Sequence, residues 1–149
     1  MKALLQRAQQ GSVSIGGKEF SQINQGIVVL LGIEKHDDKA TAAKCLEKIF
    51  AYRIFSDEDG KMNLSAKDIE ADLLIVSQFT LAAQTQKGLR PGFSSAAPPE
   101  QAEGIYEHFI ALAQEASRDT NSKIATGQFG ADMQVALVND GPVTFLLSF

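Results

Sequence analysis

A turn-forming segment that ends in proline, Asn139–Pro142, interrupts the mainly apolar end of the chain between Met133–Val138 and Val143–Phe149. Its sequence, Asn-Asp-Gly-Pro, joins residues that accept the positive φ angles of tight β turns to a residue that has no N–H group for a strand ladder. Proline in this setting belongs at a strand start, an edge or a bulge. Because most X–Pro bonds are trans, the local sequence favours a trans Pro142 that opens the last strand; the alternative is a corner of special shape.

Length, charge and cysteine content restrict the class of protein. A chain of 149 residues fits one domain, residues 1–149, whose core needs neither metal nor disulfide. Its single cysteine, Cys45, falls in a helical apolar stripe, which predicts packing rather than catalysis. The net charge of −4 argues against binding to nucleic acid over a broad surface, so we expect no DNA partner and only a local contact with any RNA. The chain has no run of about 18 apolar residues and no signal-like N-terminus, which predicts a cytoplasmic protein without a membrane partner.

The hydrophobic pattern predicts an α+β fold with a curved, mostly antiparallel or mixed sheet and two main helices. Apolar positions three and four residues apart indicate one helix after Asp38 and another after Pro98. No glycine-rich nucleotide motif opens either helix. The expected strands are Ala3–Leu5, Val13–Ile15, Gly26–Ile33, Asp72–Phe79 and a closing pair around the Gly-Pro corner.

Polar residues at the end of a buried strand, Ser77–Thr80, are the first candidates for chemistry. A hydroxyl nucleophile needs a base nearby, but the two histidines, His36 and His108, stand in no motif. Metal-binding motifs are also missing, so we expect no metal and no cofactor. Two readings stay open: the hydroxyls of Ser77 and Thr80 satisfy local backbone groups, or the site works by positioning and backbone dipoles, with help from the substrate.

The segment after this strand, Gln84–Ala97, is rich in turn formers and carries Lys87 and Arg90. Such a loop is either simply solvated or a local grip for phosphate. Its closeness in sequence to Ser77–Thr80 favours a connection with the same site.

Four motifs in this order resemble the D-aminoacyl-tRNA deacylase family. They are S-Q-F-T-L-A-A (77–83), K-G-L-R-P-G-F (87–93), T-G-Q-F-G-A-D-M (126–133) and N-D-G-P-V-T (139–144). The resemblance extends over essentially the whole chain, from Leu5–Arg7 through Tyr52–Asp57 to the C-terminus. It implies a homodimeric hydrolase that cleaves the ester between a D-amino acid and the 3′ end of tRNA and that also removes mischarged glycine.

The resemblance also implies a role for the corner. Gly141 and Pro142 would be joined by a cis bond and would enter the pocket of the partner subunit, where their backbone rejects L-amino acids. Arg7 resembles the residue that braces this corner, and Asn139 supports it.

The remaining implied roles concern the pocket and the tRNA. The pocket for the terminal adenosine and the ester would be formed by Ser77, Gln78, Phe79 and Thr80, with Phe93 and Met133 as walls. Lys87 and Arg90 would contact the acceptor end of tRNA. The family's mechanism depends on the 2′-hydroxyl of the tRNA, which agrees with the missing protein base.

Two other classes of protein fit the same residues. One is a dimeric module that binds an adenosine-like ligand or a nucleic-acid end without turnover, and the other is a small oligomeric deaminase or amidohydrolase. Release of D-tyrosine from D-Tyr-tRNA, with L-Tyr-tRNA left intact, separates the deacylase from both.

Overall fold

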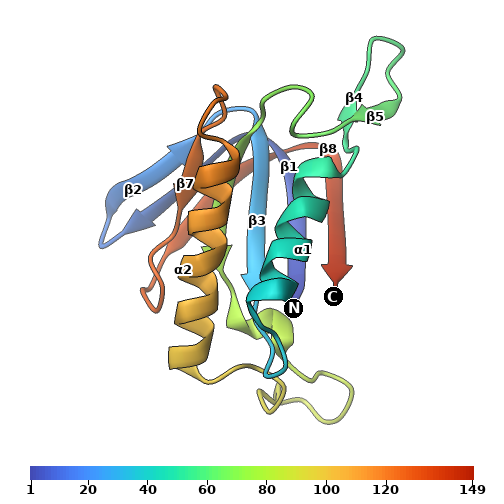
Figure 1. Cartoon of the computed structure of the whole chain (residues 1–149). Helices are drawn as coiled ribbons and strands as arrows, with labels where there is room; N and C mark the ends of the chain where they lie inside the picture. The colour runs from blue at the N-terminus through green and yellow to red at the C-terminus, as the bar shows by residue number, and fades with distance from the viewer.

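The computed structural model describes residues 1–149 as two helices packed on one face of a curved sheet (Figure 1). The elements are β1 (Lys2–Ile15), β2 (Lys18–Ile23), β3 (Gly26–Gly32), α1 (Lys39–Ala51), β4 (Phe55–Ser56), β5 (Met62–Leu64), β6 (Asp72–Ser77), the 3₁₀ turn η1 (Phe79–Ala82), α2 (Pro99–Ala116), β7 (Ile124–Thr126) and β8 (Gln134–Ser148). The α+β class and both helices are confirmed.

Strand β1 is the centre of the antiparallel part of the sheet. Its first half pairs with β3 and its second half with β2, while β8 pairs along its other edge. The prediction of two short strands, Ala3–Leu5 and Val13–Ile15, is wrong because these segments are the two ends of one strand. The residues between the two segments are largely polar, so hydropathy does not indicate that the strand continues through them. Arg7, one of these polar residues, is nevertheless buried.

The rest of the sheet is parallel, and the sheet curves into a nearly closed barrel. Helix α1 connects β3 to its parallel neighbour β6, and α2 connects β6 to β7. The sheet order therefore runs β2-β1-β3-β6-β7. The Ser21 hydroxyl on β2 donates a hydrogen bond to the carbonyl of Thr126 on β7 at 2.6 Å, which joins the two ends of this order. The predicted curved, mixed sheet is thus confirmed.

Strand β3 is covered on both faces, as its unbroken apolar sequence predicts. Ile27, Val29 and Leu31 face the larger core under the two helices, whereas Val28 belongs to a smaller core inside the curve of the sheet. Helix α1 begins at the predicted cap, where the Asp38 carboxylate accepts a hydrogen bond from the backbone N–H of Thr41 at 2.7 Å. Neither helix is long and apolar enough to cross a membrane.

The Asn139–Pro142 segment is a bulge inside β8 rather than a junction between two paired strands. Asn139 lies opposite Ala8 and Thr144 opposite Gln6, so five steps along β8 match two steps along β1. Both halves of β8 therefore run antiparallel to the same strand, and the extra residues project from the sheet. The Gly141–Pro142 bond is cis, so the trans geometry favoured by the local sequence is wrong and the geometry implied by the family resemblance is present.

The amino group of Met1 is buried beside the turn that precedes α1. It contacts the Asp37 carboxylate at 2.6 Å and the Glu34 carboxylate at 3.1 Å. The Asp37 carboxylate also accepts a hydrogen bond from the Glu34 backbone N–H at 2.6 Å. This cluster ties the start of β1 to the entrance of α1.

Candidate functional site

The site is built where β6 ends and the chain turns into η1. The backbone N–H of Gln78 donates to the Leu31 carbonyl at 2.8 Å, which extends the pairing of β6 with β3 by one residue. The next turn then folds back over Gly32, where a Cβ atom would lie 2.8 Å from the Cβ of Leu81. Glycine at this position thus permits the close approach that places η1 at the carboxyl end of the parallel strands.

A largely apolar cavity of about 510 Å³ opens at this edge. It is lined by Ile33, Val76, Ser77, Gln78, Phe79, Ala96, Ala97, Pro99, Ala102, Phe129, Gly130, Ala131, Asp132, Met133 and Val135. Of the predicted pocket residues, the structure brings Ser77, Gln78, Phe79 and Met133 together in this wall. Phe129, which also lines the cavity, was missed as a separate residue, although it lies in the quoted motif 126–133.

Two predicted pocket residues lie beside the cavity instead of lining it. The Phe93 ring packs against the exposed Phe79 ring with their centroids 5.0 Å apart. The Thr80 hydroxyl accepts a hydrogen bond from the Gln78 side-chain amide at 2.6 Å. Thr80 is therefore placed to orient Gln78, and its hydroxyl has no titratable partner in this contact.

The cavity contains no nucleophile with an attached base. Asp132 is its one titratable lining residue. His36 is exposed on the turn before α1, His108 is half-buried on α2, and neither lines the cavity. The chain also has no group of three or more His, Cys, Asp and Glu side chains arranged to hold a metal ion.

Tyr106 on α2 contacts two segments that lead into the cavity. Its hydroxyl contacts the carbonyl of Ile75 on β6 at 2.8 Å and that of Gly127 at 3.2 Å, just before the loop that carries Phe129. Its ring also packs against the ring of Phe129 at 5.9 Å. Burial raises the pKa of Tyr106 from 10.0 to about 12, so the phenol stays protonated and can donate even in moderately alkaline solution. This side chain connects both walls of the cavity to the helix layer.

The Gly-Pro corner is held by Arg7 from the neighbouring strand. The Nε of Arg7 lies 3.2 Å from the Asp140 carbonyl and 3.0 Å from the Asp140 carboxylate, and its Nη1 donates to the Ile54 carbonyl at 2.7 Å. Asn139 closes the corner by accepting the Val143 N–H at 3.2 Å. The contacts needed for the predicted braces are thus present.

The corner and the cavity of one chain lie at opposite ends of the sheet. The corner leaves β8 at the level of Ala8 and Gly26, whereas Ser77 pairs with Leu31. The five steps from Gly26 to Leu31 span about 17 Å along a strand. The corner therefore does not reach the cavity of its own chain.

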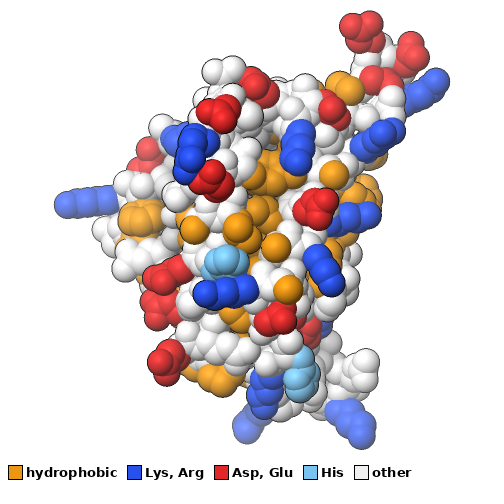
Figure 2. Space-filling model, in the orientation of Figure 1, with side chains coloured by type: hydrophobic (Ala, Val, Ile, Leu, Met, Phe, Trp, Pro, Cys, Tyr) orange, Lys and Arg blue, Asp and Glu red, His pale blue; other side chains and the backbone are white.

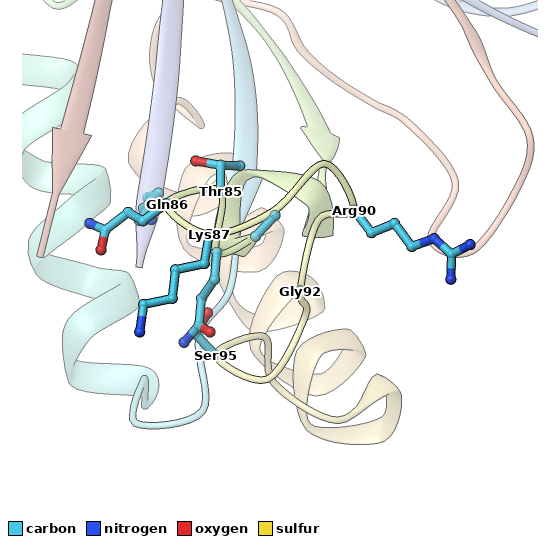
Figure 3. Close-up of a pocket in the computed structure, with 9 residues that line it drawn as sticks. Thr85, Gln86, Lys87, Arg90, Gly92 and Ser95 are labelled. Carbon is cyan, nitrogen blue, oxygen red and sulfur yellow. The ribbon is translucent and has the colours of Figure 1, made fainter.

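The two predicted basic residues are exposed and lie on one loop, but they point in different directions. Lys87 extends toward one side of the loop and Arg90 toward the other (Figure 3). On the helix-covered face, charges of both signs are interspersed without a single basic patch (Figure 2). This face therefore offers no broad basic surface for nucleic acid.

Comparison with known proteins identifies the class as hydrolases that act on aminoacyl-tRNA esters. Residues 4–148 match the family described as D-Tyr-tRNA(Tyr) deacylase, and the chain belongs to that family. It is similar to proteins named D-aminoacyl-tRNA deacylase from Pseudomonas aeruginosa strain LESB58, with 56% identity over 147 residues, and from Pseudoalteromonas translucida strain TAC 125, with 57% identity over 148 residues. Each match covers 99% of both chains. The predicted enzyme class is confirmed.

Two solved structures share the architecture. One, titled c-Myc DNA Unwinding Element Binding Protein, superposes with a TM-score of 0.94 at 43% identity and covers 100% of this chain and 99% of that one. The other, titled a probable eukaryotic D-amino acid tRNA deacylase, superposes with a TM-score of 0.84 at 16% identity and covers 98% of this chain and 97% of that one. At that low identity, the second likeness speaks for the fold alone.

Proposed function

We propose that residues 1–149 form one D-aminoacyl-tRNA deacylase domain. In this reaction water hydrolyses the ester bond that joins a D-amino acid, or mischarged glycine, to the terminal adenosine of tRNA. The products are the free amino acid and a tRNA with its terminal hydroxyl restored. The proposal is carried by one observation: an open cavity at the end of β6, lined by Ser77, Gln78 and Phe79 of the S-Q-F-T motif, in a chain that matches the deacylase family over 4–148.

In the proposed complex, the terminal adenosine and the ester occupy the cavity formed by Ser77, Gln78 and Phe79. Phe93 and Met133 limit the space, and Thr80 orients Gln78. The N–H groups of Phe79 and Thr80 open a 3₁₀ turn, so they have no partner within it and polarise the ester carbonyl.

The tRNA 2′-hydroxyl assists the attack on the ester carbonyl. The absence of a histidine or lysine from the cavity supports this assignment, because a protein hydroxyl would have no base to activate it. Positioning and backbone dipoles then supply the protein's part of the catalysis.

The active enzyme is a symmetric dimer in which each Gly141–Pro142 corner enters the partner's cavity. Two features support it: the corner is exposed and rigidly braced by Arg7, and it lies too far from the cavity of its own chain. In an isologous dimer both sites are completed by the same exchange. Rigid backbone that overlaps an L side chain rejects it by repulsion, while a D side chain points outward and glycine has nothing to reject.

Lys87 and Arg90 contact the acceptor end of the tRNA. The protein carries a net charge of −4, so this footprint is small and its dependence on salt shallow. We place the reaction in the cytoplasm, where aminoacyl-tRNA is used, and we expect neither a cofactor nor a DNA or membrane partner to take part in it.

A matched pair of substrates tests the function. Purified protein is expected to release D-tyrosine from D-Tyr-tRNA and to leave L-Tyr-tRNA intact. Equal hydrolysis of both, or of neither, would contradict the proposal and favour a different hydrolase or a binding module. Gel filtration that gives a stable, active monomer would contradict the shared site.

The role of the 2′-hydroxyl has a separate test. Thr80→Ala is expected to retain substantial activity, whereas a D-aminoacyl-tRNA whose terminal ribose lacks the 2′-hydroxyl is cleaved poorly. A Thr80→Ala variant that folds and binds substrate but does not turn over would instead indicate a threonine nucleophile.

A further inference from the structure

A second cavity, of about 610 Å³, lies at the loop that follows η1 (Figure 3). It is lined by Lys2, Ala83, Gln84, Thr85, Gln86, Lys87, Arg90, Gly92 and Ser95. We call it the loop cavity. Its lining residues include three with cationic side chains, of which Arg90 extends to the far side of the loop, together with one apolar residue and no carboxylate (Figure 3). It is therefore chemically distinct from the apolar cavity beside it.

The main chain around the loop cavity is fixed. Gln84 and Gly92 exchange two backbone hydrogen bonds, of 2.7 and 3.0 Å, which close the base of the loop. The Ser95 hydroxyl donates to the Ala82 carbonyl in η1, and the Ser95 carbonyl accepts the N–H of Lys35 at 3.0 Å. The cavity is therefore anchored to η1 and to the turn that follows β3 rather than built on a free loop.

Two amines reach this cavity from distant parts of the chain. Lys87 comes from the loop, and no carboxylate in the chain pairs with it. Lys2 comes from the first residue of β1, and its Nζ lies 3.8 Å from Glu34, a carboxylate that the Met1 amino group already contacts at 3.1 Å. Both cations therefore retain most of their capacity to bind an anion.

Neutral donors complete the cavity. Gln84, Thr85 and Gln86, whose side chains carry amide or hydroxyl donors, are also among its lining residues. Ammonium groups combined with amide and hydroxyl donors, with no competing acid, are the groups that contact phosphate oxygens in nucleic-acid complexes. A base would find no aromatic surface here on which to stack. The lining thus favours the sugar-phosphate backbone over the bases.

We infer that the loop cavity binds a phosphodiester of the single-stranded 3′ end of tRNA, next to the nucleotide held in the ester cavity. The inference rests on the proposed function and deepens it, because it assigns the contact of Lys87 to a backbone phosphate and adds Lys2 to that contact. One loop joins the two cavities: Phe93 packs on Phe79 of the ester cavity, and Gln84 and Gly92 line the loop cavity. An acceptor end whose last nucleotide lies against Phe79 would continue along this loop.

The test compares Lys87→Gln, Lys2→Gln and the double variant with wild type. Lys61→Gln is the matched control, because Lys61 is an exposed lysine of the β4–β5 hairpin, whose only carboxylate contact is Asp59 at 4.0 Å. Binding of uncharged tRNA is measured by fluorescence anisotropy over a range of salt concentrations. Hydrolysis is measured on D-Tyr-tRNA and on the 3′ ester of D-tyrosine with adenosine, which carries no phosphate.

Each cavity variant is expected to weaken tRNA binding about fivefold and to raise the KM for D-Tyr-tRNA similarly, as for one exposed charge contact. The slope of log affinity against log salt is expected to fall by about 0.7 for each lost contact. The kcat and the hydrolysis of the adenosine ester stay at wild-type values, as does every measurement for Lys61→Gln.

Cavity variants that bind tRNA with the affinity and salt slope of Lys61→Gln would overturn the inference. So would equal losses on both esters, which would show that the loop acts by shaping the ester cavity. Binding of inorganic phosphate without any effect on tRNA would assign the cavity to a free anion and also overturn it. A wild-type protein that cleaves neither ester, yet binds tRNA with a slope that depends on Lys2 and Lys87, would overturn the proposed function while supporting the cavity.

Discussion

Replacing Arg7 by alanine tests whether a single side chain holds the Gly-Pro corner. Arg7 is 9% exposed, and its guanidinium connects three groups on two other segments: the Ile54 carbonyl, the Asp140 carbonyl and the Asp140 carboxylate. Alanine removes all three contacts and leaves the Ile54 carbonyl without this partner. Asp140→Ala is the matched control, because it removes the ion pair and keeps both bonds to carbonyl groups.

The magnitude follows from the exposure of each contact. A hydrogen bond from a charged donor contributes about 1.5–3 kcal/mol, so loss of the bonds to Ile54 and Asp140 costs about 3 kcal/mol in total once the chain relaxes. The Asp140 side chain is 33% exposed, so solvent screens the ion pair. That contact is worth about 0.5 kcal/mol. Arg7→Ala should therefore lower the free energy of unfolding several times more than Asp140→Ala.

The assay is urea unfolding followed by circular dichroism at one fixed protein concentration, since the stability of the proposed dimer would depend on concentration. Hydrolysis of D-Tyr-tRNA and L-Tyr-tRNA is measured in parallel. We expect Arg7→Ala to lose D-over-L selectivity while Asp140→Ala largely retains it. Equal losses of stability and selectivity in the two variants would refute the assignment of the brace to the two carbonyl contacts.

Three further substitutions probe the corner, the cavity and the N-terminal cluster. Gly141→Ala places a side chain on backbone with φ +124°, and its Cβ would lie 2.7 Å from a methyl group of Val143. We expect kcat/KM for D-Tyr-tRNA to fall about tenfold, or D-over-L selectivity to fall to a similar extent. Wild-type kinetics would contradict the role of the corner. Tyr106→Phe should cost about 1 kcal/mol in urea unfolding at pH 8. Burial raises the pKa of Tyr106 from 10.0 to about 12, so between these pH values the phenol ionises first in the unfolded state and the wild type should lose stability. The Tyr106→Phe variant should not show this loss. Identical pH profiles of stability for the two proteins would exclude a contribution from Tyr106. Asp37→Asn weakens the 2.6 Å contact with the Met1 amino group and should lower the free energy of unfolding by about 3 kcal/mol, whereas an unchanged melting temperature would show that Glu34 alone suffices.

Local patterns predicted the elements whose contacts are local or uniformly apolar. The unbroken apolar sequence of Gly26–Ile33 indicated a strand buried on both faces, and the Asp38 cap marked the start of α1. The path of Asn139–Pro142 was not predictable in this way. Its two flanking segments pair with β1, at least 120 residues earlier, and nothing in the turn sequence encodes that partner. Registers set by distant strands have no local signal.

In the site, too, local patterns predicted some residues, whereas others depend on contacts between distant segments. Ser77–Phe79 could be placed at a strand end from hydropathy alone, and the structure puts them in a cavity wall. Phe129 depends on packing against Tyr106, a contact between two segments that sequence periodicity does not relate. The divergence of Lys87 and Arg90 follows from the loop conformation between them, where Gly88 has φ +75°. Side-chain direction within an irregular loop is a property of its backbone, not of its composition.

The separation of the corner from the cavity within one chain has a genetic consequence for the proposed dimer. A subunit damaged at Gly141 and a subunit damaged at Gln78 would each form inactive or unselective homodimers. Mixed dimers of the two would contain one site with both defects and one site with none. Random exchange of equal amounts would thus restore about a quarter of all sites. Two defective alleles would then complement each other, which a pocket made by one chain does not allow.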